Sequence, residues 1–355
     1  MNSKKKSILD YDILYTLIAI VVGFLIGAIF LVVAGISPAA AYGKLFSSIF
    51  SKPKYLVWTL MYAAPIMLTG LSVAFSFRTG VFNIGAEGQF VVGEVAAAAV
   101  GIFLDVPAII HVPLCLLAAA AAGALWALLP GLMKVKRGIH EVLSFIMFNW
   151  IAYYFSNYFV NLSFIKAEGK EASKDILDSA SMLFPDSIRS TLGCSSANWG
   201  ILLAIVLAIV MYVIIEKTTL GYKLKAVGFN KDAARFAGIN ADASVLTALG
   251  ISGALSALGG AVLVLGMGGR LAQFAGQEGY GFEGITVALI GSSSPLGCIF
   301  SAIFYGAMKY GGSKLTMIKA PAEVIDIIMG CVIILIAISH VFKVLFKKIG
   351  KKEGK

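Results

Sequence analysis

Long runs of apolar residues limit how this chain can fold more than any other feature of its sequence. The first run extends from Ile13 to Ala34 without a charged residue. A bilayer core of about 30 Å requires about 20 apolar residues in a helix. Backbone polar groups in lipid must pair internally, so each run must be helical. We therefore expect ten membrane spans, at about 13–34, 55–77, 82–104, 107–133, 139–160, 199–216, 242–266, 279–293, 295–312 and 321–343.

The composition agrees with lipid as the main solvent of the chain. The residues AVILMFWYC make up 59% of the sequence, and charged residues make up 14%, against about 25% in soluble domains. A soluble core could not bury that much apolar surface, which excludes a soluble enzyme, a disordered regulator and a nucleic-acid-binding protein. The four cysteines are scattered without a CxxC pair, so neither a metal site nor a disulfide framework is expected.

The basic residues predict the orientation of the chain. Lys4–Lys6 precede the first apolar run, but that run is longer than the core of a signal peptide, so we expect a retained helix. Ten spans place both termini on one side, and 18 of the 29 Lys and Arg residues fall on that side. Such a bias indicates cytoplasmic termini, with a basic cytoplasmic tail at 344–355. The segment 161–198 is then an extracytoplasmic loop, and 217–241 is cytoplasmic.

Two pairs of matching motifs indicate an internal repeat. The segment 85–91 matches 281–287, and 141–147 matches 323–329, in the same order along the chain. Equivalent helices lie five spans apart, so the copies are inverted. We predict an all-α polytopic membrane protein with one transmembrane domain over 1–355. Repeat one (spans 2–5) covers 55–160, and repeat two (spans 7–10) covers 242–343. Inverted repeats are typical of transporters, with the transport path between the halves.

No catalytic or metal-binding constellation is visible. The three histidines are isolated, and no HExxH motif, nucleophile elbow or Walker A sequence is present. The segment 279–284 fits GxGxxG, but a dinucleotide site would need a preceding strand. Close helix packing through small residues explains these glycines better. We therefore expect a transport subunit that is not an enzyme and binds no metal or cofactor.

Carboxylates inside or at the ends of the apolar runs are the most informative polar residues. Charges at membrane depth usually face a protein interior or a water-filled cavity. They lie at Glu87, Glu94, Glu141, Glu283, Glu323 and Asp326. For Glu141 and Glu323, a structural role in the first turn of a helix is favoured, because the helix dipole attracts anions there. For Glu87 and Glu283, a transport-path role and a structural hinge remain equally open. The short runs at 279–293 and 295–312 meet at Ser292–Pro295, which predicts a broken element beside a pathway.

The cytoplasmic segment 217–241 predicts a short helix. Asn230 is a good N-cap, Asp232 suits the first turn, and Gly238 is placed to end the helix. Ala233, Ala234 and Ala237 would then form a small-residue face. A helix of this length is marginal alone in water and needs a surface to dock on. An ordinary connecting loop is the alternative.

Three stretches resemble the permease subunits of ABC importers for branched-chain amino acids, simple sugars and nucleosides. They are Gly80–Gln89, the pattern from Leu220 to Ile239, and 281–291 followed by Pro295–Gly297. The residue sequence of 82–89 and the pair Glu141–Val142 most resemble nucleoside permeases that work with a basic-membrane-protein-type lipoprotein. Family members usually carry Gly-Glu-Asn where this chain has Gly228–Asn230, so the contact made by Phe229 is in question.

The resemblance implies a division of labour between chains. Segment 217–241 would be the coupling helix that contacts a separate ATPase subunit, which holds ATP and Mg²⁺. Its contact residues would be Gly221, Ala226, Gly228, Asn230, Ala233, Ala234, Ala237 and Gly238. Further expected partners are a second permease subunit, taken to be a different homologous chain, and an extracytoplasmic lipoprotein that binds the solute and docks near 161–198. The expected location is the plasma membrane of a bacterium.

Two classes of function remain at this stage. In the first, the chain forms the path for a nucleoside through the membrane, or for a simple sugar. The residues expected along that path are Phe82, Asn83, Glu87, Gln89, Phe90, Phe282 and Glu283. In the second, the chain is an ion-coupled secondary transporter that titrates Glu87 and Glu283. The cytoplasmic helix argues against the second class, because such a carrier does not need one.

Overall fold

A computed structural model describes residues 12–318 and 324–337. The chain divides into two compact units, Met1–Lys52 with Met308–Lys355, and Pro53–Ala307. Each expected span overlaps a helix, and the described residues contain no named strand, only isolated β-bridges. Six helices of the described part are long and apolar enough to cross a membrane: α1, α3, α4, α5, α8 and α11. The chain is therefore an all-helical, multi-pass membrane protein.

In the described part of the first unit, α1 (Asp12–Val33) packs against α14 (Val324–Ala337). The contact is close because Gly23 of α1 faces Val332. The unit also contains α2 (Pro38–Phe50), the short helix η4 (Leu315–Ile318) and the end of α13. Helix α2 was not expected, because its thirteen residues are too few for the membrane spans on which the sequence analysis was based. Its start is nevertheless marked in the sequence by the cap Ser37 and by Pro38 at the first helical position.

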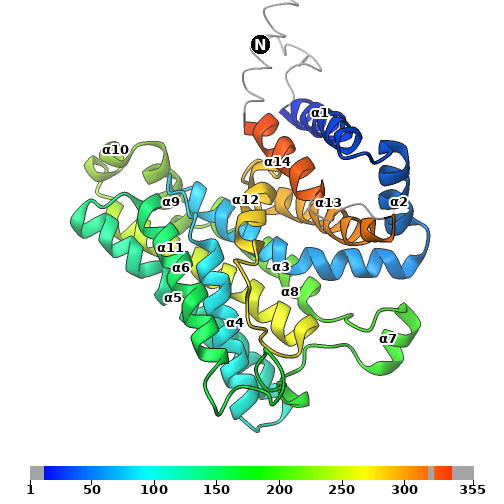
Figure 1. Ribbon diagram of the computed structural model, residues 1–355. Helices are drawn as coiled ribbons and strands as arrows, with labels where there is room; N and C mark the ends of the chain where they lie inside the picture. Colours follow the sequence, from blue (N-terminus) through cyan, green and yellow to red (C-terminus); the bar gives the residue numbers. More distant parts are fainter. Residues whose placement is uncertain (1–11, 319–323, 338–355) are drawn as a thin grey trace, which may run out of the picture. The chain divides into compact units, whose positions relative to one another are not determined.

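The larger unit is built around α11 (Ala241–Leu263), which packs against α3 (Pro53–Phe77), α4 (Ala86–Phe103) and α5 (Ala108–Arg137) (Figure 1). Small residues allow these helices to approach. A Cβ atom on Gly93 of α4 would lie 2.2 Å from the carbonyl oxygen of Ala257 in α11. A similar approach joins Gly123 of α5 to Gly253. Small residues at helix contacts are the usual basis of packing in membranes.

The pattern of exposure on α5 is that of a helix at the edge of a bundle in lipid. His111, Cys115, Ala119, Gly123 and Ala127 are buried at a spacing of four residues. Large apolar side chains on the other side of the helix, such as Ile109, are exposed. A stripe at this spacing lies along one helix face, so the remaining face is available to hydrocarbon.

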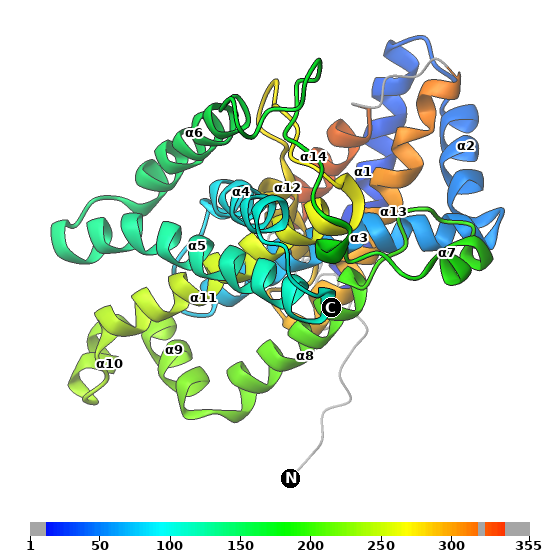
Figure 2. The ribbon, with the colours of Figure 1, turned by 90° about the horizontal axis from the view of Figure 1, so that it is seen from below.

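The other elements of this unit connect or flank the central helices. They are α6 (Glu141–Val160), η2 (Asp178–Ala180), α7 (Asp186–Leu192), α8 (Gly200–Lys217), α9 (Thr219–Phe229), α10 (Lys231–Phe236), the π-helix η3 (Val264–Gly268), α12 (Tyr280–Ile290) and α13 (Pro295–Ser313). Within this unit, α10 and α7 lie at opposite ends in both views (Figures 1 and 2).

The segment 161–198 packs against another part of the larger unit, the residues that follow α11. Backbone N–H groups of Ser173, Ile176 and Met182 donate to the carbonyls of Leu271, Gly269 and Leu265, at 2.8, 2.9 and 2.9 Å. The side chain of Asp175 pairs with Arg270 at 3.0 Å. The predicted loop therefore covers the π-helix and the residues that follow it.

Candidate functional site

Two residues expected along the transport path, Asn83 and Gln89, lie in a closed polar cluster between α3, α4 and α11. Asn83 donates to Gln89 at 2.8 Å and to the hydroxyl of Ser252 at 2.7 Å, and Gln89 donates back to Asn83 at 3.0 Å. Ser252 donates to the carbonyl of Ser72 at 2.7 Å. Asn83 and Gln89 are fully buried. Because their polar atoms are paired within the chain, the cluster holds the three helices in register.

Asn83 also explains why α4 begins later than expected. Its side-chain oxygen accepts a hydrogen bond from the N–H of Gly85 at 3.1 Å. This side-chain-to-backbone bond stabilises a turn in place of a helix. The residues 82–85 therefore form a turn, and α4 begins at Ala86 rather than at Phe82.

Glu87 is positioned as an anchor for the start of α12. Its two carboxylate oxygens accept from the N–H groups of Gly279 and Gly281, both at 2.7 Å, and its side chain is buried. Helix N-termini carry unpaired N–H groups and favour an anion. The two glycine–glutamate motifs also touch, because a Cβ atom on Gly281 would lie 2.1 Å from the backbone nitrogen of Glu87. This geometry favours the hinge interpretation of Glu87 over a lining role.

The aromatic and acidic residues expected near Glu87 are dispersed. Phe90 is buried and stacks on Tyr280, with ring centres 5.0 Å apart and planes at 11°. Phe82 is half-buried and stacks on Phe77. On α12, Phe282 is exposed and Glu283 is half-buried. The structure therefore does not gather the seven expected residues around one cavity.

A cavity of about 260 Å³ lies where α11 stops being a regular helix. The π-helix η3 ends at Gly268, its C-cap Gly269 has a φ of 66°, and the chain is irregular until α12 begins at Tyr280. In membrane proteins, irregular backbone at depth is tolerated where it is buried in protein or lines a cavity. Single π-turns also concentrate at functional sites. The unwound segment 269–279 and its cavity are therefore the strongest candidate for a solute site.

The polar groups of this cavity come from three elements. They are Glu94 on α4, Arg270 and Glu278 on the segment 269–279, and Tyr280 at the start of α12. Apolar walls come from Leu263, Met267, Leu271 and Phe274, among others. Glu94 is 2% exposed and its side chain hydrogen-bonds to Glu278, but its Oε2 has no hydrogen-bond partner among the residues that the structure describes. An unpaired buried carboxylate oxygen is costly, which makes it a functional candidate.

The break that the sequence predicted lies after α12, and a second interruption, which was not predicted, lies before it. Ser292 and Ser293 do form a sharp turn, with φ values of 53° and 52°, between α12 and α13. The unwound segment that borders the cavity precedes α12. Its signal was present in Gly268, Gly269, Gly276 and Gly279, which interrupt the chain between two apolar runs. Glu278 and Tyr280 were missed because no local pattern links them to Glu94.

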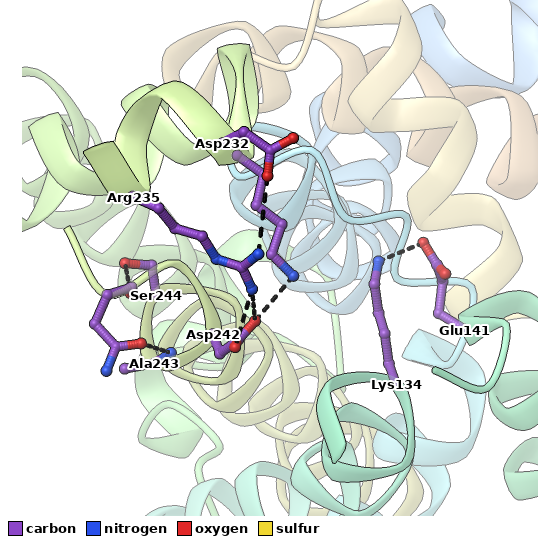
Figure 3. A network of polar contacts seen from close by, with 9 residues as sticks. Lys134, Glu141, Asp232, Arg235, Asp242, Ala243 and Ser244 are labelled. Carbon is purple, nitrogen blue, oxygen red and sulfur yellow. Dashed lines mark hydrogen bonds and ion pairs between the residues drawn. The ribbon is translucent and has the colours of Figure 1, made fainter. Parts of the chain in front are cut away.

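The remaining carboxylates have mainly structural positions. Glu141 lies in the first turn of α6 and pairs with Lys134 at 2.7 Å (Figure 3). This agrees with the structural interpretation of Glu141. Its counterpart in the repeat, Glu323, lies outside the described residues. Asp326 lies in the first turn of α14.

The segment 217–241 forms two helices, where one was expected. Helix α9 was missed, whereas α10 begins as predicted. The side chain of Asn230 accepts from the N–H groups of Asp232 and Ala233, at 3.0 and 2.9 Å. Gly238 has a φ of 79°, which a glycine adopts easily, two residues after α10 ends. Figure 3 shows Arg235 of α10 beside Asp242 of α11, at 3.2 Å.

The predicted small-residue face of α10 needs one correction. Ala234 is buried in a cluster of the chain's own side chains that includes Val81, Phe145 and Val227. Ala233 and Ala237 are exposed. Ala234 therefore attaches α10 to the rest of the chain, and a partner could reach only the other side of the helix.

Two large aromatic side chains mark the outer surface of this segment. Phe229 and Phe236 are 89% and 95% exposed, the latter at the end of α10. The other side of α9 packs closely against the backbone that follows α3, because a Cβ atom on Gly228 would lie 2.2 Å from the carbonyl oxygen of Arg78. The segment therefore has one face fixed to the body of the protein and one face that carries exposed aromatic groups.

Comparison with known proteins identifies relatives over almost the whole chain. Residues 55–337 match a family described as "Branched-chain amino acid transport system / permease component". The guanosine ABC transporter permease protein NupP of Bacillus subtilis is 39% identical, over 96% of this chain and 97% of its own. The nucleoside ABC transporter permease protein NupB of Lactococcus lactis is 33% identical, over 98% and 95%. The glucose ABC transporter permease protein TsgB13 of Haloferax volcanii is 32% identical, over 90% and 85%.

Proposed function

Because the chain belongs to the family of branched-chain amino acid transport system permease components, we propose that it is the membrane-spanning subunit of an ABC importer for nucleosides. The observation that carries the proposal is similarity over nearly full length to permeases named for guanosine and nucleosides. The chain provides the solute path, and a separate ATPase subunit binds ATP with Mg²⁺. A second permease subunit and an extracytoplasmic lipoprotein complete the importer.

The two-helix segment α9–α10 supports an ATPase partner. Exposed phenylalanines on a polar surface are typical of interaction sites. Phe229 and Phe236 provide such groups, and Ala233 lies exposed between them in sequence. We assign the contact with the ATPase to this outer face, while Gly228 and Ala234 fix the segment to the rest of the permease. Movement of the partner would then be transmitted to α3 and α11.

The inverted arrangement of two repeats with ten spans also belongs to the proposal. Each matched motif opens a helix: 85–91 opens α4, 281–287 opens α12, 141–147 opens α6, and the described part of 323–329 opens α14. Within the larger unit, the motifs of α4 and α12 contact each other directly. Cytoplasmic termini in a bacterial plasma membrane follow from the distribution of Lys and Arg.

Reconstitution tests the proposal. The chain is assembled in vesicles with its ATPase, second permease and binding protein, and uptake of radiolabelled guanosine is measured with and without ATP. We expect uptake that requires ATP and hydrolysis by the ATPase subunit. Uptake driven by an ion gradient without that subunit would instead identify a secondary transporter.

A simple sugar is the second candidate solute, because a glucose permease is among the relatives. Competition separates the two solutes in the same vesicles. Excess unlabelled guanosine should block uptake of labelled nucleoside, whereas glucose or ribose should not. Uptake of labelled glucose that guanosine fails to inhibit would replace the nucleoside assignment with a sugar.

A further inference from the structure

The cavity beside the unwound segment 269–279 has the features of a site for one flat, hydrogen-bond-donating group. We propose that it holds the base of a purine nucleoside, and that Glu94 recognises adjacent N–H donors on the edge of that base, as guanine presents them. This inference rests on the proposed function, since it concerns the selectivity of the permease itself. It assigns selectivity to the membrane subunit in addition to the binding protein.

The size of the cavity favours a base over a larger solute. Its volume of about 260 Å³ is below the range of about 300–1,000 Å³ that is usual for ligand pockets. A second cavity of about 400 Å³ shares Met267, Gly268 and Arg270 with it and lies under the segment 175–196. A nucleoside could therefore place its base in the cavity of about 260 Å³ and its ribose toward the cavity of about 400 Å³.

The aromatic wall favours a flat solute. Tyr280 lines the cavity, and Phe90 stacks against its ring at 5.0 Å and 11°. Because both rings are almost fully buried, this pair is a rigid platform. A base that stacks on Tyr280 would extend the stack by one layer. Stacking between bases and aromatic side chains is a general source of nucleotide affinity.

The polar groups favour a solute that brings hydrogen-bond donors. The side chains of Glu94 and Glu278 hydrogen-bond to each other, which requires one shared proton, and their remaining oxygens are acceptors. The donor Arg270, which also lines the cavity, is paired with Asp175 at 3.0 Å. The Oε2 atom of Glu94 has no partner among the residues that the structure describes. Guanine presents N1–H and the 2-amino group side by side, which matches two adjacent acceptor oxygens of this carboxyl pair, the Oε2 atom of Glu94 among them. Hypoxanthine lacks the 2-amino group and satisfies the carboxylate less completely.

The variant Glu94→Gln tests this assignment in the reconstituted importer. It keeps the shape of the side chain but replaces one acceptor with a donor. With the same binding protein in every sample, we compare the uptake of labelled guanosine and labelled inosine. We expect the guanosine:inosine uptake ratio to fall about tenfold, as expected when a charge-assisted hydrogen bond is lost. Using a ratio removes effects of reduced expression or folding.

Glu87→Gln is the matched control, because Glu87 lies on the same helix and is equally buried, but is bound by backbone N–H groups. It should lower the uptake of both nucleosides and leave their ratio unchanged. Tyr280→Leu should lower the uptake of both as well, whereas Tyr280→Phe, which keeps the ring, should retain it. A wild-type ratio in Glu94→Gln would overturn the inference while leaving the proposed function intact. If the wild-type importer takes up neither nucleoside with ATP, the proposed function itself fails.

Discussion

The anchor formed by Glu87 gives a quantitative prediction about stability. Its two oxygens accept from the N–H groups of Gly279 and Gly281, both at 2.7 Å, a length typical of charge-assisted bonds. Each such bond contributes roughly 1.5–3 kcal/mol. In Glu87→Gln, the amide oxygen can still accept one bond, but the amide nitrogen faces the second N–H group. The substitution should therefore destabilise the protein by about 1.5–3 kcal/mol.

The assay is the apparent melting midpoint of the purified protein in detergent, followed by loss of the monodisperse peak after heating. We expect Glu87→Gln to lower this midpoint by several degrees and Glu87→Ala to lower it further, because alanine accepts neither bond. Glu216→Gln is the matched control. Glu216 forms a partly exposed ion pair with Lys225 at 2.9 Å, and such pairs contribute about 0–1 kcal/mol because solvent screens them.

The result that would refute this reasoning is a midpoint for Glu87→Gln that equals that of Glu216→Gln. It would mean that the bonds to the start of α12 are not made or contribute nothing. If uptake alone fell while the midpoint stayed unchanged, Glu87 would belong to the transport path, and the hinge interpretation would be wrong.

Three further predictions follow from contacts and exposure. Gly281→Ala should destabilise the protein by about 1–3 kcal/mol, because the new methyl group would meet the backbone of α4. The control Gly276→Ala should be neutral, because its methyl group would meet nothing within 4 Å. Equal melting midpoints for the two variants would contradict this packing. Phe236→Ser should leave the permease folded but prevent its co-purification with the ATPase, and normal ATP-driven uptake would show that α10 is not the contact. Ser187→Cys should react with an impermeant maleimide in whole cells, because Ser187 is exposed on the predicted extracytoplasmic loop. The native Cys194 should stay unlabelled, because burial raises the pKa of its thiol. Labelling of Ser187→Cys only after lysis would show that the predicted topology is wrong.

The interior of this protein could be anticipated only where a residue's role depends on its near neighbours in sequence. The apolar runs predicted the helices because lipid requires internally paired backbone over about 20 residues. Asn230 predicted the start of α10 because a cap acts within three residues. Helix α9 and the turn at 82–85 were missed, since each depends on weaker local preferences that neighbouring structure resolves.

The candidate site was only partly visible in the sequence for the same reason. Glu87 stood out as a charge in an apolar run, but its partners lie more than 190 residues away, so its function as an anchor required the structure. Ala234 was assigned to a docking face from helical spacing and from the family resemblance. Spacing identifies which residues share a face, but it does not say whether that face meets a partner or the chain itself.

The sequence by itself indicated lipid as the solvent, the helices of the long apolar runs, the family resemblance and the motif around Glu87. The tertiary structure decided that Asn83 and Gln89 are paired with each other, and that Glu94, Glu278 and Tyr280 share one cavity. Local composition and spacing govern helix formation, because hydrogen bonds within a helix join residues four positions apart. A cavity forms between helices that are distant in sequence, so its lining depends on how those helices pack and on where α11 unwinds.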